Sequence, residues 1–342
     1  MADKNKKSNN FNMPLLAVAP MMDWTDRHCR YFHRQLSRYA QLYTEMVTAP
    51  ALVRGNALHL LEHDPSEHPL VLQLGGSDPK ELAQAARIGW QAGYREINLN
   101  CGCPSDRVQS GSFGAVLMQS PDLVAEICAE MSAACPAEIT VKCRIGVDDQ
   151  TPEEVLPLFL GKLQDAGVRH VIIHARKAWL QGLSPKDNRE IPPLDYPLVM
   201  AMKAEFPALR ISLNGGVTTL GQACDLLAQG LDGVMIGRAA YQRPGDILCD
   251  ADRRIFGAEK GRSVTDALQD MRPYIAAELA MGTRLAAITR HMLGLFAGQP
   301  GARQWRRILS EQAHRRSAGL DVLDTALDAV MQARSQMDTA PP

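Results

Sequence analysis

The sequence predicts an α/β fold, a (β/α)8 TIM barrel followed by a small C-terminal all-helical domain. Three observations support this prediction: short β-branched runs alternate with amphipathic stretches, prolines stand where several of those stretches begin, and no strand signal follows residue 237. Alternating strands and helices favour a parallel sheet with helices on its faces. Eight such units in roughly 250 residues are typical of a TIM barrel.

The expected strands are short runs rich in Val, Ile and Leu. They cover residues 15–19, 42–46, 70–74, 97–100, 139–143, 171–174, 211–214 and 233–237. Proline at a first-turn position marks the start of a helix. Three expected helices begin with that signal, and they cover residues 79–93, 121–134 and 152–167.

The chain divides into four parts. The barrel is expected over residues 14–256, and a polar, glycine-bounded segment at 257–262 indicates a linker. A helical domain is expected over 257–336, where the chain is rich in Ala, Leu and Arg and has no strand signal. Residues 1–13 and 337–342 are predicted to be disordered tails.

The composition is that of an ordinary globular protein of 342 residues, with 46% apolar and 22% charged residues. No apolar run suits a signal peptide or a membrane span, so we expect a cytoplasmic location and no membrane partner. The eight cysteines form no CxxC pair and have no histidine spacing suited to zinc. We therefore expect reduced thiols and no metal.

Positive charge is concentrated near the C-terminus. The formal net charge of the chain is −1, but residues 284–316 contain seven arginines and one acid, Glu311, a local charge of +6. A solvated charged face is the plain explanation of such a cluster. Acidic residues normally intersperse such a face, however, so the cluster favours contacts with nucleic-acid phosphates.

Polar residues stand at the carboxyl ends of the expected strands, where TIM barrels carry their active sites. The residues at these ends are Pro20, Met21, Met22, Glu45, Gln73, Asn100, Lys142, His174, Asn214, Gly237 and Arg238. One polar residue at such a position is usually a hydrogen-bonded core group. Seven strands that deliver one in register indicate a functional site.

Glycine-rich turns follow the last two strands, at Asn214-Gly215-Gly216 and Gly237-Arg238. In TIM barrels these two turns commonly bind phosphate, because glycine lets backbone N–H groups approach the anion and arginine adds a fork of donors. Tight turns without a ligand are the alternative. Two such turns on adjacent strands favour a phosphate site, for a cofactor or a sugar phosphate.

Two thiols, Cys101 and Cys103, lie in a loop shaped by glycine and proline after the fourth strand. An ordinary thiol has a pKa of about 8.5, so it is mostly protonated near neutral pH and can donate a proton as well as attack. Lys142 and His174 can donate hydrogen bonds to an electron-rich ring or a carbonyl. A Schiff-base lysine is the alternative, but it leaves the facing thiol without a purpose.

Several motifs resemble the tRNA-dihydrouridine synthase family over nearly the whole chain. They are APMMDWTD (19–26), LQLGG (72–76), INLNCGCPSDRV (97–108), VKCRIG (141–146), HAR (174–176), NGG (214–216) and GR (237–238). The segments GLSPKDNREIPPL (182–194) and GQPGARQWRR (298–307) resemble the A branch of that family. Cys101 departs from the family pattern, which has a small apolar residue there.

The resemblance implies FMN as cofactor, NADPH or NADH as reductant and Cys103 as the acid that protonates uracil C5. FMN would be held by Pro20, Met21, Met22, Gln73, Lys142, His174, Asn214, Gly215, Gly216, Gly237 and Arg238. The partner would be tRNA, reduced at D-loop uridines 20 and 20a, with no obligate protein partner. The tRNA contacts would be Asn100, Lys186, Arg189, Arg303 and Arg306.

Two other functions fit parts of the pattern. A flavin barrel acting on a free pyrimidine or another small molecule accounts for the strand ends but leaves the arginine cluster unexplained. A catalytically idle RNA-binding barrel accounts for the arginines, but the complete set of strand-end groups counts against it. Purified protein without flavin would indicate the idle RNA-binding barrel. Turnover of free uridine comparable to that of tRNA would indicate the small-molecule enzyme.

Overall fold

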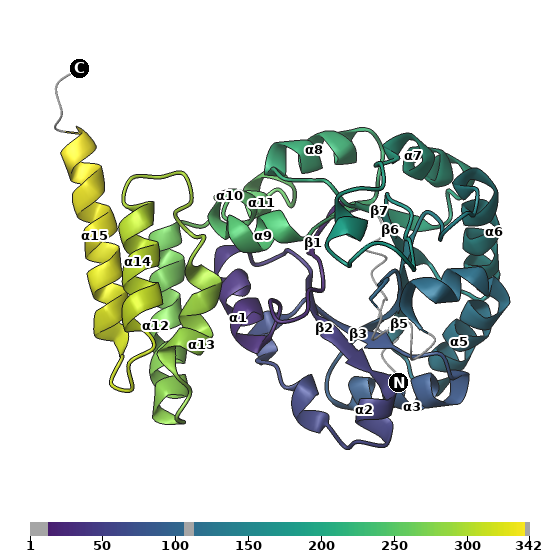
Figure 1. The fold of residues 1–342 in the computed structure, drawn as a ribbon, viewed down its shortest axis with the longest axis horizontal. Coiled ribbons are helices and arrows are strands. Elements are labelled where there is room, and N and C mark those ends of the chain that lie inside the picture. The colour runs from purple at the N-terminus through teal and green to yellow at the C-terminus, as the bar shows by residue number, and fades with distance from the viewer. Residues whose placement is uncertain (1–12, 106–112, 339–342) are drawn as a thin grey trace, which may run out of the picture.

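The computed structural model describes residues 13–105 and 113–338, and eight parallel strands form its centre. They are β1 (Leu15–Val18), β2 (Leu42–Thr48), β3 (Leu70–Gly75), β4 (Glu96–Cys101), β5 (Glu138–Arg144), β6 (His170–His174), β7 (Arg210–Asn214) and β8 (Gly233–Ile236). The order β1-β8-β7-β6-β5-β4-β3-β2 is closed by a parallel bridge between Ala17 and Gln41, just before β2. All eight predicted strands are confirmed, and Figure 1 shows them as a ring.

Helices surround the ring of strands (Figure 1). They are α1 (Arg27–Leu36), α2 (Ala49–Val53), α3 (Pro79–Gln91), α5 (Pro121–Ala134), α6 (Pro152–Asp165), α7 (Tyr196–Glu205), α8 (Leu220–Ala228), α9 (Arg238–Gln242), α10 (Pro244–Leu248) and α11 (Ala251–Arg254). Proline opens α3, α5 and α6, as predicted, because its fixed φ suits the first turn and that position needs no N–H.

The apolar core has two parts. The larger lies between the strands and the surrounding helices, and the smaller, inside the ring, includes Tyr43, Val71, Ile172 and Met235. The interior also holds buried polar side chains, which need partners because the core excludes water. Those partners determine the geometry of the site described below.

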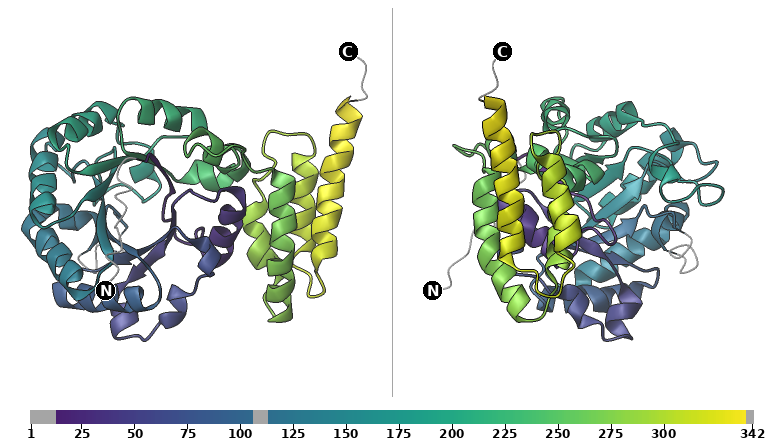
Figure 2. Two further views of the ribbon diagram at one scale, coloured as in Figure 1. Left: turned by 180° about the vertical axis from the view of Figure 1, so that it is seen from behind. Right: turned by 60° about the vertical axis from the view of Figure 1, so that its left-hand side comes forward.

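A C-terminal all-helical region follows the barrel, as predicted, and lies against one side of it (Figure 2). It contains α12 (Val264–Ala280), α13 (Leu285–Thr289), α14 (Ala302–Gln312) and α15 (Leu320–Asp338). Fully buried Trp305 lies at its centre and donates its indole N–H to the carbonyl of Met292 at 2.9 Å. The expected tails, 1–13 and 337–342, lie outside the described residues except for Met13, Met337 and Asp338.

No described helix combines the length and the apolar character that a membrane crossing requires.

Helix α1 joins the barrel to the C-terminal helical region. The Arg27 guanidinium donates two hydrogen bonds to the Glu278 carboxylate on α12, and Nδ1 of His28 lies 2.7 Å from the Tyr274 hydroxyl. The C-terminal helices are therefore fixed to the helix that directly follows the first barrel loop.

Asp26 has two roles at this junction. Its carboxylate caps α1 by accepting the Cys29 N–H at 3.0 Å, and it pairs with Arg290 and His291 of the C-terminal region. His291 is fully buried and lies 3.0 Å from that carboxylate. These contacts hold the pKa of Asp26 well below its usual range against the opposing effect of burial.

We predict that Asp26→Ala destabilises the protein more than loss of a helix cap alone. Asp78, which caps α3 through the Glu81 N–H, is the matched control, and Asp78→Ala should cost about 1 kcal/mol. Asp26→Ala should cost about 2–4 kcal/mol, because it also removes the carboxylate that pairs with buried His291 and with Arg290. Urea unfolding of both variants measures the difference, and equal losses would contradict the junction role.

Candidate active site

The parallel register brings the polar strand ends together at one end of the barrel. Asn100 on β4 is the partner of Lys142 on β5, Arg144 is the partner of His174 on β6, and His174 is the partner of Asn214 on β7. This end is the carboxyl-terminal mouth, where barrel enzymes bind their substrates. The candidate residues of the sixth and seventh strands therefore adjoin those of the fourth and fifth.

A chain of hydrogen-bonded amides crosses the barrel interior below the mouth. The Asn98 amide donates to the Thr140 hydroxyl at 3.0 Å and accepts from Gln73 at 2.9 Å. The Gln73 oxygen in turn accepts from Asn100 at 2.9 Å. Each amide orients the next, because an amide can donate only from its nitrogen and accept only at its oxygen.

The last amide of this chain positions the loop that carries Cys103. The side-chain oxygen of Asn100 accepts the backbone N–H groups of Gly102 and Cys103, both at 3.0 Å. The Cys103 thiol is half-buried, and its Sγ lies 3.4 Å from the Ser105 hydroxyl. Asn100, for which the family resemblance implies a tRNA contact, thus also fixes the backbone that carries Cys103.

Cys101 occupies a different environment from Cys103. Its side chain is fully buried in the core, and burial raises its pKa well above the ordinary value for a thiol. Burial also raises the pKa values of Cys128 and Cys143 to about 12. Cys101 is therefore protonated at neutral pH and packs as a small core residue.

Two nitrogen groups face the mouth in different protonation states. Burial, assisted by the charge of Arg144, lowers the pKa of Lys142 to about 8. Burial, with the charges of Arg144 and Lys142, holds the pKa of His174 well below its usual range, so its ring is neutral at neutral pH. Within residues 13–105 and 113–338 the Lys142 ammonium has no hydrogen-bond partner, which leaves it for a ligand.

The turn after β7 exposes bare backbone beside His174. Gly215 and Gly216 have φ values of 106° and 73°, which residues with a side chain rarely adopt. A Cβ on Gly215 would lie 2.5 Å from the His174 ring, and one on Gly216 would lie 2.4 Å from Leu194. Both positions therefore require glycine, for the left-handed backbone and for the close packing against His174 and Leu194.

The turn after β8 supplies the cation of the predicted phosphate site. Gly237 precedes α9, and the Arg238 side chain, which begins that helix, is half-exposed. The Arg238 guanidinium pairs with the Glu190 carboxylate from the loop after β6. An anion bound at this turn would therefore share the Arg238 guanidinium with Glu190 or displace Glu190 from it.

The loop after β1 forms a tight turn at the same mouth. The Met21 carbonyl accepts the N–H groups of Trp24 and Thr25, at 3.1 and 3.0 Å. Pro20 enters this turn from β1, and the Met22 side chain is 56% exposed. The turn thus presents apolar thioether surface next to the donors described above.

The other predicted tRNA contacts lie in two places. Lys186 and Arg189 are exposed on the loop after β6, and the Cys103 and Arg238 side chains are close enough to Arg189 to influence its pKa. Arg303 and Arg306 are exposed on α14, with Arg307 beside them, and none of the three has an ion-pair partner in the described part of the chain. Arg290, also in the +6 cluster, is instead paired with Asp26.

Sequence reasoning missed three residues that build the mouth: Asn98, Arg144 and Asn188. Asn98 and Arg144 each lie two positions from a predicted residue, Asn100 and Lys142, and therefore face the same side of their strands. Strand period could have identified both of them. Asn188 is fully buried in the loop after β6, where no strand period marks the inward-facing positions.

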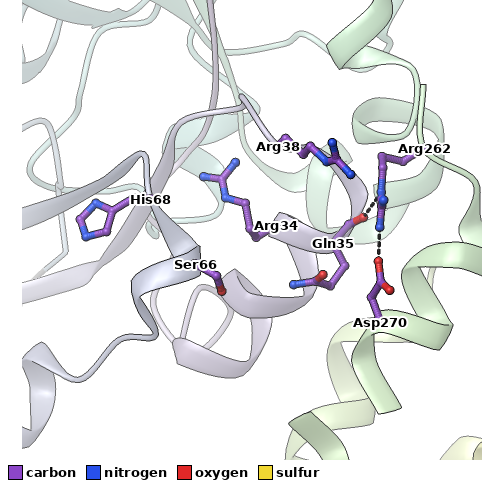
Figure 3. A pocket seen from close by; sticks show the side chains of 7 residues that line it. All are labelled: Arg34, Gln35, Arg38, Ser66, His68, Arg262 and Asp270. Carbon is purple, nitrogen blue, oxygen red and sulfur yellow. Dashed lines mark hydrogen bonds and ion pairs between the residues drawn. The ribbon is translucent and has the colours of Figure 1, made fainter. Parts of the chain in front are cut away.

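A cavity of about 310 Å³ lies elsewhere, and its lining includes Arg34, Arg38 and Arg262 (Figure 3). Arg34 belongs to the last turn of α1, and His68 precedes β3, which places the cavity at the opposite end of the barrel from the mouth. The Arg262 guanidinium donates to the Gln35 carbonyl and pairs with Asp270. The cavity contains none of the strand-end residues and does not mark the active site.

Enzymes with a (β/α)8 barrel carry their active sites at the carboxyl-terminal mouth. The hydrogen-bond donors and the half-buried thiol of this chain lie at that mouth, as in such an enzyme. The chain belongs to the dihydrouridine synthase family. The family described as Dihydrouridine synthase (Dus) matches residues 17–333, which confirms the resemblance seen in the sequence and places the chain among the flavin-dependent oxidoreductases.

Relatives in three bacteria support the same family. A Vibrio cholerae protein is 56% identical over 316 residues, which are 91% of this chain and 95% of the relative. An Escherichia coli protein is 55% identical over 324 residues, 93% of this chain and 92% of the relative. A Shewanella oneidensis protein is 52% identical over 329 residues, 96% of this chain and 97% of the relative. Each is named tRNA-dihydrouridine(20/20a) synthase.

We predict that Gly215→Ala destabilises the protein more than Gly230→Ala. Both glycines have a φ of 106°, so both substitutions add backbone strain of about 1–3 kcal/mol. A Cβ on Gly230 meets nothing within 4 Å, whereas one on Gly215 meets His174 and should add about 1–3 kcal/mol of overpacking. Chemical denaturation compares the two, and similar losses would show that the His174 ring moves aside without cost.

Proposed function

We propose that this chain reduces uridines 20 and 20a in the D-loop of tRNA to 5,6-dihydrouridine, with FMN as cofactor and NADPH or NADH as reductant. The observation that carries this proposal is the half-buried Cys103 thiol at the barrel mouth, on backbone that Asn100 and Arg144 hold. Family membership and the shared name of three relatives support the choice of substrate.

The residues at the mouth fit FMN. The bare backbone of Gly215 and Gly216, with Gly237 and Arg238 on the neighbouring turn, suits a single phosphate group. The ring would lie against Pro20, Met21 and Met22, and its polar edge would meet the side chains of Gln73, Lys142, His174 and Asn214. When bound, FMN supplies the hydride that reduction of the uracil C5–C6 double bond requires.

Lys142 is suited to the polar edge of a flavin for an electrostatic reason. Its ammonium is half-buried and unpartnered within the described residues, and a pKa of about 8 leaves it mostly protonated at neutral pH. It can therefore donate to an electron-rich ring atom. Neutral His174 donates from one ring nitrogen only, so it adds a hydrogen bond without a second charge.

Cys103 is the proposed source of the proton at uracil C5. Asn100 accepts the backbone N–H groups of residues 102 and 103, so the backbone that carries the thiol is held at the mouth. A positioned acid contributes typically 10²–10⁴-fold to a rate. Cys101, which is fully buried, cannot reach a substrate at the mouth.

A tRNA substrate accounts for the exposed arginines of the C-terminal region. A uridine in folded tRNA must be extruded before it can enter a barrel mouth, and extrusion costs a few kcal/mol that contacts elsewhere must offset. Arg303 and Arg306 on α14 can supply phosphate contacts, and Lys186 and Arg189 can hold the RNA at the mouth.

The test of this function is dihydrouridine formation in tRNA from cells that lack the protein. We predict that purified protein with NADPH forms dihydrouridine at positions 20 and 20a, as mapped by mass spectrometry, and that heat releases FMN from it. Cys103→Ala should retain flavin and NADPH oxidation but lose roughly 10²–10⁴-fold in uridine reduction. Cys101→Ala is the matched control and should remain active.

Three outcomes would contradict the proposal. An inactive Cys101→Ala beside an active Cys103→Ala would reverse the roles of the two thiols. Turnover of free uridine comparable to that of tRNA would favour a small-molecule enzyme. Protein without flavin after reconstitution would favour an RNA-binding barrel that does not catalyse the reaction.

We predict that Arg303 and Arg306 bind RNA and contribute nothing to flavin binding. If each neutralises one phosphate, the double variant Arg303→Ala/Arg306→Ala should reduce the slope of log K against log[salt] by about 1.4–1.8. The measurement is a salt titration of tRNA binding, with flavin spectra taken in parallel.

The matched control for this prediction is Arg87→Ala/Arg95→Ala. It removes the same charge from exposed positions on α3 and just before β4. Its salt slope should equal that of the unmodified protein. If both double variants change the slope equally, net charge alone governs binding and the α14 arginines make no specific contact.

A further inference from the structure

We propose that Arg144 is a positioning residue that couples the loop carrying Cys103 to the loop carrying Lys186 and Arg189. Its side chain is 3% exposed and lies at the end of β5, between the ends of β4 and β6. The proposal rests on the function proposed above and adds a residue to which that function assigns no role. It explains how the Cys103 thiol is held in a fixed position relative to Lys186 and Arg189.

The Arg144 guanidinium contacts both loops at once. Its Nε donates to the carbonyl of Gly102, next to Cys103, at 3.1 Å. Its Nη1 donates to the carbonyl of Asn188 at 2.9 Å and to that of Lys177 at 3.2 Å. One side chain therefore holds the backbone of two loops that lie more than seventy residues apart in the chain.

The Gly102 peptide units are held from two sides. Asn100 accepts the N–H of Gly102 and the N–H of Cys103, while Arg144 binds the carbonyl of Gly102. With these backbone groups paired, rotation of the peptide that links Gly102 to Cys103 would break hydrogen bonds on both sides. The direction in which the Cys103 side chain leaves the backbone is thus set jointly by Asn100 and Arg144.

The other loop is organised by Asn188, whose carbonyl Arg144 binds. The Asn188 side chain is fully buried, its Oδ1 accepts the Trp179 N–H at 2.7 Å, and its Nδ2 donates to the Trp179 carbonyl at 2.8 Å and to the Leu183 carbonyl at 3.2 Å. Lys186 and Arg189 lie on either side of this anchor. A shift of Asn188 would therefore move the RNA-binding side chains and the Arg144 guanidinium together.

Arginine is the residue that suits this position. Its planar guanidinium presents five N–H donors in a fixed fork, so a single group can bind carbonyls in different directions. A lysine ammonium has three donors on a flexible stem and cannot hold the same geometry. Burial lowers the pKa of Arg144 only to about 10, so it remains charged at neutral pH and its hydrogen bonds are charge-assisted.

The control is a buried arginine that binds carbonyls away from the mouth. Arg34 is 6% exposed and donates to the carbonyls of Ser37, Glu67 and Pro69, at the opposite end of the barrel (Figure 3). Arg34→Lys removes the same kind of contact as Arg144→Lys and should cause a similar loss of stability. It should leave the Cys103 loop unchanged.

The experiment measures both loops directly in the flavin-loaded protein. Hydrogen exchange reports residues 177–190, and alkylation of Cys103 by iodoacetamide, mapped by mass spectrometry, reports the other loop. Arg144→Lys should accelerate exchange in residues 177–190 and change the alkylation rate of Cys103, while Arg34→Lys changes neither. Exchange or alkylation that changes in only one loop would overturn the coupling.

A second variant tests the same link from the other end. Asn188→Ala keeps Arg144 and does not touch Cys103, yet it should change the alkylation rate of Cys103 in the same direction as Arg144→Lys. An unchanged rate in folded Asn188→Ala would overturn the proposal even if Arg144→Lys failed to fold.

The kinetic consequence is a selective loss in the second half-reaction. Arg144→Lys should reduce flavin with NADPH at the normal rate but form dihydrouridine more slowly, on the order of 10²-fold, the usual effect of a misplaced reacting group. Equal losses in both half-reactions would indicate a general structural role and overturn the assignment. Because exchange and alkylation require no uridine reduction, a failure of the coupling is distinguishable from a failure of the proposed function.

Discussion

The geometry of the mouth depends on the hydrogen-bonded amides inside the barrel. Asn98, Gln73 and Asn100 are buried inside the ring of strands, where an unpaired polar group is costly, and they hydrogen-bond to one another with donation in one direction. Donation starts at the backbone N–H of Cys103, passes through the three amides to the Thr140 hydroxyl, and ends at the Glu96 carboxylate. The Cys103 side chain on its loop thereby takes its position from the strands, which is how barrel enzymes combine a stable core with a defined active site.

Positive charge is the second property of the mouth. Besides burial, the charge of Arg144 lowers the pKa of Lys142, that of Arg189 lowers the pKa of Arg144, and that of Arg238 lowers the pKa of Arg189. Glu190 pairs with Arg238 there. Under this crowding His174 remains neutral, since a further proton would add to the same field. An anionic ligand would relieve the repulsion. The arrangement is thus matched to a phosphate-bearing cofactor and a polyanionic substrate, the two ligands that the proposed function brings to this end of the barrel.

Short sequence patterns predicted the strands and helices of the barrel well, but they did not predict the long-range hydrogen bonds that hold the residues at its mouth. Each strand carries its own β-branched run and each of three helices its own opening proline, so the fold class and all eight strands follow from short windows of sequence. The roles of Asn100 and Arg144 depend on partners that only the closed barrel brings near, as does the pairing of Asp26 with His291, which lies 265 residues away. Strand period places Arg144 on the same face as Lys142, but its role follows from the carbonyls of Gly102 and Asn188 beside it, which belong to loops distant in sequence.

The contacts of α1 with the C-terminal region explain how the arginines on α14 could assist binding at the barrel mouth. Phosphate contacts on α14 can offset the cost of extruding a uridine only if the helical region is held at a fixed distance from the barrel, because a loosely tethered domain would bind RNA without presenting the base. Arg27 with Glu278, His28 with Tyr274, and Asp26 with Arg290 and His291 supply that fixation, and all three barrel residues belong to α1 or cap it. Asp26 also follows the Met21 turn by only a few residues. The helix that contacts the C-terminal region is therefore the one that follows the proposed flavin surface, so a single element would set the distance between the proposed RNA contacts and the proposed site of reduction.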